Sequence, residues 1–234
     1  MTFECAETGA SGALPSSEAA RGPREDAPHT TPSVVQVDRA LHALAISGVH
    51  VASRVISDRY IPTLHALERA AVARSVVTRQ AEFATGRALL RSLLGEDVPI
   101  PIAPDRAPVL PVGVHASLAH DHHLAVAALS RSATVRSIGI DIEPVTELPA
   151  EMAAVIVRTD EGSVDAHLAF TLKEAAYKAW SRLGGRMLDF HDVRLEVGAD
   201  SFVAEVLPTG MLLQGRYVNI GDRWISLVVV QRGQ

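Results

Sequence analysis

Cysteine is almost missing from this chain of 234 residues: the single Cys5 excludes an intramolecular disulfide and fits a reducing compartment. Aromatic residues are also scarce, at 4%, so leucine, valine, isoleucine and alanine must fill the core. No run of about 18 apolar residues offers a membrane span, and the N-terminus lacks the basic and then apolar segments of a secretory signal. Together these absences predict a cytoplasmic protein that does not associate with membranes.

An excess of basic charge is lacking as well, because 22 Lys and Arg face 27 Asp and Glu, which gives a formal net charge of −5. A nucleic acid partner would call for the opposite balance, so none is expected. There is also no glycine-rich phosphate loop and no internal repeat. What remains is a composition with 47% hydrophobic and 21% charged residues, which predicts one globular domain or two small ones.

The stretch from Phe170 to Trp180 contains neither glycine nor proline and consists mostly of good helix formers, which predicts a helix. Glu174 and Lys178 are four residues apart and therefore neighbours on one face of it. Taken alone, this pattern indicates a surface helix with one Glu-Lys pair. A stripe at spacings of three and four is expected to face the core and comprises Ala169, Leu172, Ala176, Trp180 and Leu183.

A second acidic element lies upstream, in Gly139–Pro144, and reads as a strand that ends at its proline. Because side chains alternate along a strand, Asp141 and Glu143 share one face while Ile140 and Ile142 point into a core. Two neighbouring carboxylates repel each other unless a cation or solvent separates them. Such hard oxygen ligands suit magnesium, although a solvated strand edge would explain this element in isolation.

Gly-Ile-Asp-Ile-Glu followed by Phe-x-x-Lys-Glu-Ala-x-x-Lys resembles the paired signature of the 4′-phosphopantetheinyl transferases. The likeness is nearest to the enterobactin-synthetase-D-like, or surfactin-type, branch of holo-acyl-carrier-protein synthases. It covers roughly Leu64 to Val197, where further motifs agree in order. These are Arg79–Arg87 (Arg-x-x-Glu-Phe-x-x-x-Arg), the proline-rich Ala107–Pro111, Ser117–His120 (Ser-x-x-His) and Leu183–Phe190.

The resemblance implies an α/β fold of two similar halves related by pseudo-twofold symmetry, with the cofactor in the cleft between them. We expect the N-terminal half, on the coenzyme A nucleotide side, over residues 34–133. The C-terminal half, on the magnesium and catalytic side, is expected over residues 134–234. Residues 1–33 are rich in Ala, Ser, Pro, Glu and Gly with few large apolar residues, which predicts a disordered leader.

By the same resemblance, Asp141, Glu143 and Glu174 are expected to hold Mg²⁺, and Asp141, Glu174 and Lys178 to be catalytic. Glu174 is the candidate general base, acting directly or through a metal-bound water, and a purely ligating role is the alternative.

Five residues are expected to contact the phosphates of coenzyme A. Arg79 and Arg87 correspond to the basic residues at the 3′-phosphate end, where a planar guanidinium forms paired hydrogen bonds with phosphate. His120 matches a histidine that contacts a coenzyme A phosphate, and Lys173 and Lys178 are expected to contact the phosphates too.

The implied reaction transfers the 4′-phosphopantetheine group from coenzyme A to a serine of an apo acyl carrier or peptidyl carrier protein and releases 3′,5′-ADP. We expect a monomer. Two departures from the family pattern favour an alternative, a carrier-binding homologue with impaired catalysis. Ala119 stands where relatives usually have Ser or Thr, and Arg106 lies in a proline-rich loop where they often have lysine or glycines. A magnesium-dependent phosphohydrolase is a further alternative.

Overall fold

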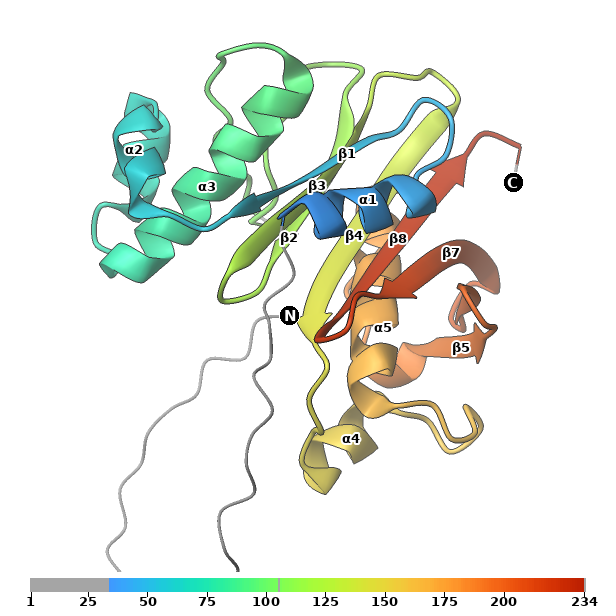
Figure 1. Cartoon of the computed structure of the whole chain (residues 1–234). Helices are drawn as coiled ribbons and strands as arrows, with labels where there is room; N and C mark the ends of the chain where they lie inside the picture. The colour runs from blue at the N-terminus through green and yellow to red at the C-terminus, as the bar shows by residue number, and fades with distance from the viewer. Residues whose placement is uncertain (1–33, 105, 234) are drawn as a thin grey trace, which may run out of the picture. The chain divides into compact units, whose positions relative to one another are not determined.

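The structure is a computed structural model that describes residues 34–104 and 106–233. The leader predicted over residues 1–33 lies outside the described residues. Within them the chain forms two antiparallel sheets with helices packed on their faces, as Figure 1 shows, and this confirms the predicted α/β class. Among these residues no helix is both long and apolar enough to cross a bilayer.

The N-terminal part of the described chain builds a three-stranded antiparallel sheet. Its elements are α1 (Val34–Leu44), β1 (His50–Val55), the 3-10 helix η1 (Asp58–Thr63), α2 (Ala66–Val72), α3 (Val77–Leu94), β2 (His115–His120) and β3 (Leu124–Ser130). The strand order is β1-β3-β2, and every residue of the central strand is buried. Both faces are therefore covered: Leu89 and Leu90 of α3 pack on one side, and Leu41 of α1 packs on the other.

The C-terminal part builds a five-stranded antiparallel sheet with the order β4-β8-β7-β6-β5. Its elements are β4 (Val135–Pro144), α4 (Ala150–Ile156), α5 (Ala166–Ser181), the 3-10 helix η2 (Phe190–Asp192), β5 (Val193–Val197), β6 (Ser201–Val206), β7 (Met211–Asn219) and β8 (Arg223–Gln231). The stripe predicted on α5 packs against one face of this sheet, with Leu172 and Ala169 fully buried. Ile140 and Ile142 of β4 are also fully buried, as their alternation predicted.

Helix α5 lies unusually close to β4, and the reason is Gly139. A Cβ atom at this position would stand 1.9 Å from the carbonyl oxygen of Ala175 and 2.7 Å from the backbone nitrogen of Ala179. Only glycine fits where two backbones approach this closely. The glycine of the Gly-Ile-Asp-Ile-Glu motif therefore brings the two predicted acidic elements into contact.

The two sheets meet where β4 runs alongside β2. Within residues 34–104 and 106–233 no strand ladder joins them. Instead, the hydroxyl oxygen of Ser117 accepts a hydrogen bond from the backbone N–H of Ile140 at 3.0 Å. Ser117 of the Ser-x-x-His motif thus satisfies a strand N–H at the junction, where it would otherwise be buried without a partner. As a result, the end of β2 that carries His120 lies close to the end of β4 that carries Glu143.

Candidate active site

The predicted carboxylates and Lys178 come together across β4 and α5. Nζ of Lys178 donates to Oδ1 of Asp141 at 2.6 Å and to the carbonyl oxygen of Ile140 at 3.2 Å. Asp141 is only 4% exposed, and Glu174, one helical turn before Lys178, is 8% exposed. Glu143 follows two residues after Asp141 on β4 and is half-buried. The result is a largely buried group of three acids and one ammonium.

The acidic surroundings change the protonation of this group. Burial raises the pKa of Asp141 to about 7, and the charges of Glu143 and Glu174 add to the rise. Lys178 opposes the rise but does not cancel it. For Lys178 itself burial would lower the pKa, but the neighbouring carboxylates, led by Asp141, outweigh burial and raise it. The site therefore holds more negative charge than one ammonium neutralises.

The chemistry of this group fits a magnesium ion, although its side chains do not form a finished metal site. Among the described residues no set of three or more His, Cys, Asp and Glu side chains has the spacing needed to hold a metal. The buried Oδ2 of Asp141 nevertheless has no hydrogen-bond partner there. A hard divalent cation binds favourably beside an unsatisfied carboxylate oxygen that has two further acids near it.

On the other side of the junction, Arg79 of α3 and His120 of β2 are in contact. Nη1 of Arg79 lies 3.1 Å from Nε2 of His120 and donates to Oε2 of Glu82 at 3.0 Å. Burial lowers the pKa of His120 against the opposing effect of Glu82, and the charge of Lys178 lowers it further. Glu82 was not predicted as a site residue. Its place in the Arg-x-x-Glu motif, one turn after Arg79, was the signal available.

Arg87 lies deeper, with only 3% of the residue exposed. Its Nε donates to the carbonyl oxygen of Ile100 at 2.7 Å, and its guanidinium carbon stacks over the Phe83 ring at 4.2 Å from the centroid. Burial lowers its pKa to about 10. Arg87 therefore anchors the proline-rich loop to α3, and its contact with a phosphate stays a prediction.

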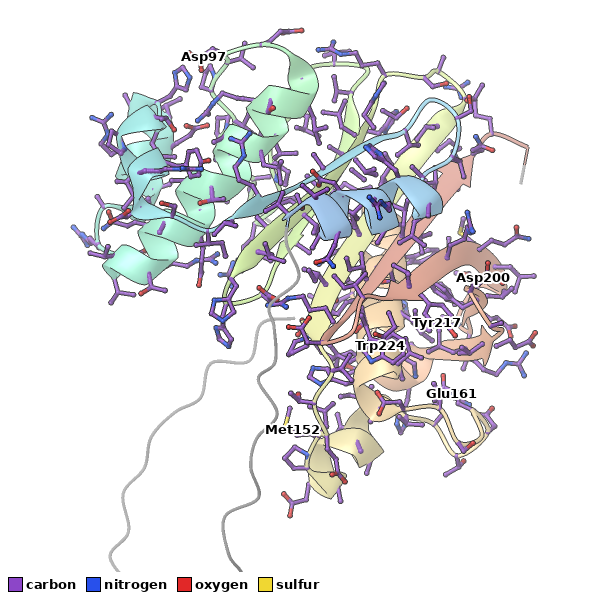
Figure 2. All side chains as sticks on the ribbon, in the orientation of Figure 1. Asp97, Met152, Glu161, Asp200, Tyr217 and Trp224 are labelled. Carbon is purple, nitrogen blue, oxygen red and sulfur yellow. The ribbon has the colours of Figure 1, made fainter. Side chains whose placement is uncertain are left out.

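Lys173 is paired away from Asp141 and Lys178, and its contact with a coenzyme A phosphate stays a prediction. Its Nζ donates to Oε2 of Glu161 at 2.9 Å and to the carbonyl oxygens of Ile156 and Phe190 at 2.8 and 3.0 Å. The side chains of Lys173 and Glu161 are 1% and 0% exposed. Because adjacent residues of a helix point in different directions, Glu174 reaches the site while Lys173 ties α5 to the segment around Glu161, labelled in Figure 2.

Replacing Lys173 by Met is therefore expected to destabilise the fold rather than to weaken coenzyme A binding alone. It leaves the Glu161 carboxylate buried without its ammonium, a change that typically costs about 3–5 kcal/mol. Urea unfolding of Lys173→Met measures this loss. The double variant Lys173→Met/Glu161→Gln removes both charges and should recover much of it; no recovery would contradict the ion-pair explanation.

His167 at the start of α5 is a second residue that the sequence did not single out. Its Nδ1 donates to the carbonyl oxygen of Thr146 at 2.9 Å, and its Nε2 lies 3.7 Å from Oε2 of Glu143. Burial would lower its pKa, but Glu143 and Thr146 together raise it. His167 thus faces the outermost of the three acids. No sequence motif predicted His167, because its position near Glu143 depends on how α5 packs against the end of β4.

The junction of the two sheets thus carries carboxylates, a lysine, a histidine and an arginine. Such a set of side chains is typical of enzymes that act on phosphorylated ligands. Comparison with known proteins gives the family. The sequence profile described as the 4′-phosphopantetheinyl transferase N-terminal domain matches residues 67–130. With the relatives described next, this shows that the chain belongs to the 4′-phosphopantetheinyl transferase family.

The relatives cover most of both chains. The 4′-phosphopantetheinyl transferase Svp of Streptomyces mobaraensis is 36% identical over 178 residues, which is 68% of this chain and 72% of the relative. The 4′-phosphopantetheinyl transferase PptT of Mycobacterium tuberculosis is 35% identical over 176 residues, 65% of this chain and 77% of the relative. The 4′-phosphopantetheinyl transferase Npt of Nocardia iowensis is 30% identical over 185 residues, 69% and 83%.

Proposed function

We propose that this 4′-phosphopantetheinyl transferase moves the 4′-phosphopantetheine group of coenzyme A onto a serine of an apo acyl carrier or peptidyl carrier protein. The serine oxygen forms a bond to the β-phosphorus, the pyrophosphate bond breaks, and 3′,5′-ADP leaves. The observation that carries the proposal is the contact of Asp141 with Lys178 beside Glu174, in a member of this family. The nucleophile belongs to the partner, so this chain needs no reactive serine or cysteine of its own.

Asp141, Glu143 and Glu174 would hold Mg²⁺. When bound, the ion would neutralise the pyrophosphate and stabilise the charge that develops on it. Because Asp141 has a raised pKa, it must release a proton to become a full ligand. The Asp141–Lys178 pair then keeps the carboxylate ionised and holds the ammonium at the site.

Glu174 is proposed to receive the proton of the serine hydroxyl, directly or through a water, with a purely ligating role as the alternative. Lys178 is proposed to face the phosphates and to stabilise the leaving group, for which its raised pKa keeps it charged at neutral pH. The buried surroundings make both contributions larger than they would be in water.

The coenzyme A nucleotide is proposed to bind on the side of α3 and β2. Arg79 and His120 would contact its phosphate, and Glu82 holds Arg79 in place. On this proposal residues 34–133 form the nucleotide half and residues 134–234 the magnesium and catalytic half. We further expect a monomer in the cytoplasm, as the sequence predicts.

Intact-mass analysis of an apo carrier protein incubated with the enzyme, coenzyme A and magnesium tests the function. The expected result is a phosphopantetheine adduct that requires all components and is matched by release of 3′,5′-ADP. Carrier proteins of fatty-acid, polyketide and peptide synthases should each be tried. Absence of any adduct across the three would favour a carrier-binding homologue, and coenzyme A breakdown without an acceptor would favour a hydrolase.

A further inference from the structure

An ion pair at the sheet junction has no part in the chemistry described above. Nε of Arg223, the first residue of β8, donates to Oδ2 of Asp121 at 2.5 Å, and its Nη1 donates to Asp222. The side chains of Arg223 and Asp121 are only 5% and 6% exposed. Buried charges of this kind are costly unless they are well paired, so their geometry is tightly fixed. Figure 1 shows the β2–β3 turn and the start of β8 at the same end of their sheets.

Asp121 also determines the conformation of the β2–β3 turn. Its Oδ1 accepts hydrogen bonds from the backbone N–H groups of His123 at 2.6 Å and Leu124 at 2.7 Å. Its carbonyl oxygen lies 3.2 Å from Nδ1 of His120. Because a carbonyl only accepts, Nδ1 carries the proton of the neutral ring, and Nε2 is the nitrogen turned toward Arg79. Asp121 thus fixes the turn and orients the imidazole.

Arg223, the other partner of the pair, connects this turn to β4, the strand that carries Asp141 and Glu143. Arg223 lies directly opposite Pro144 in the β4–β8 register, one residue beyond Glu143. Four residues before Asp121, Ser117 makes its own link to the backbone of Ile140. His120 therefore lies between two links that hold β2 against the segment of β4 that carries the acids.

We propose that Asp121 and Arg223 are a positioning pair that sets His120, on the coenzyme A side, at a fixed place relative to Asp141 and Glu143 on the metal side. The pair touches no reacting atom and acts through the placement of His120. The inference rests on the proposed function, because it takes His120 as a contact of a coenzyme A phosphate. With the pair broken, coenzyme A should bind less well while the chemistry of bound substrate is largely preserved.

Steady-state kinetics of Arg223→Gln test whether the pair affects coenzyme A binding but not the chemistry of bound substrate. We expect the KM for coenzyme A to rise about 10-fold, with kcat within about 3-fold and the KM for the carrier protein unchanged. Asp121→Asn should act in the same direction, since its amide oxygen still accepts the two turn hydrogen bonds but carries no charge for Arg223. Arg223→Lys should recover part of the affinity because it keeps the charge without the planar fork.

The matched control is Arg194→Gln. Arg194 donates to Glu205 at 2.5 Å within the five-stranded sheet, away from the junction, and its loss should leave the KM for coenzyme A unchanged. Thermal unfolding of each variant separates an effect on binding from an effect on folding, and all kinetics are measured well below the melting temperature.

The two proposals fail in different ways. No transfer by the unmodified enzyme contradicts the proposed function. Transfer by the unmodified enzyme together with an unchanged KM for coenzyme A in folded Arg223→Gln overturns the positioning role, as does a loss confined to kcat. If Arg223→Gln does not fold, Asp121→Asn gives the same test, and an unchanged KM in that variant overturns the proposal.

Discussion

Glu174→Gln is expected to lower the rate of carrier-protein modification by about 1,000-fold or more while leaving the protein folded. The substitution keeps the size of the side chain but removes the charge that acts on both Asp141 and Lys178. It removes a candidate base and a candidate magnesium ligand at once. Initial rates from intact-mass analysis over a range of magnesium concentrations measure the loss.

The magnesium series distinguishes the two roles of Glu174. Recovery of the rate at high magnesium indicates that the residue acts as a ligand, whereas a loss that no magnesium concentration repairs indicates the base. Glu196→Gln is the control, since Glu196 is 74% exposed on β5 and should leave the rate unchanged. A Glu174→Gln enzyme with full activity would remove the residue from the mechanism altogether.

Asp141→Asn should have opposite effects on activity and stability. We expect transfer to fall by about 100- to 1,000-fold, because a neutral amide is a poor magnesium ligand and gives Lys178 no countercharge. The metal-free protein should become more stable at pH 8, by about 1–2 kcal/mol, since a buried carboxylate with a raised pKa is ionised there at a cost. The gain is smaller than the pKa shift alone implies because Lys178 loses its partner.

The pH dependence follows from the direction of the shift. The folded pKa of Asp141 is about 7 and the unfolded value is 3.8, so the folded protein binds more protons between these values. The free energy of unfolding contributed by Asp141 is therefore fully present below about pH 4 and is lost as the pH rises through 7. Thermal unfolding in a chelator from pH 5 to 8 should show this slope in the parent and not in Asp141→Asn, with Asp200→Asn on the exposed β6 flank as the control. A variant less stable than the parent at pH 8 would contradict the assignment.

The local sequence pattern predicted much of the fold. Strands β5 and β6 can be read from the sequence, because each is a short run rich in β-branched and apolar residues, and the residues between the two runs favour a turn. The boundary of α2 is harder to predict, because it depends on the Glu68 carboxylate, which accepts a hydrogen bond from the backbone N–H of His65 and so fixes the start of the helix at Ala66. Helix α1 was not predicted, although Val37, Leu41 and Leu44 have helical spacing and all three are buried.

The position of a site residue could be predicted when it depends on the helix or strand that carries the residue. It could not be predicted when it depends on how a distant segment packs. Alternation along β4 placed Asp141 with Glu143, and the four-residue spacing on α5 placed Glu174 with Lys178. The family resemblance implied that the two elements form one site, and Lys178 contacts Asp141. The motif also included Lys173, yet this lysine is paired with Glu161, from the segment after α4. Neither that pairing nor the approach of His167 to Glu143 follows from spacing, because each depends on how separate segments pack.

Amine chemistry on this protein has unusually few targets, because Lys173 and Lys178 are the only lysines in the chain and every other basic side chain is arginine or histidine. The amine of Lys173 is enclosed by Glu161 and two carbonyl oxygens, while Lys178 is 29% exposed at the site. Of the two lysines, an acylating or cross-linking reagent aimed at amines would therefore reach Lys178, which is proposed to face the phosphates. Immobilisation or dye labelling through lysine would therefore modify the proposed site, and labels are better placed on a cysteine introduced at the surface.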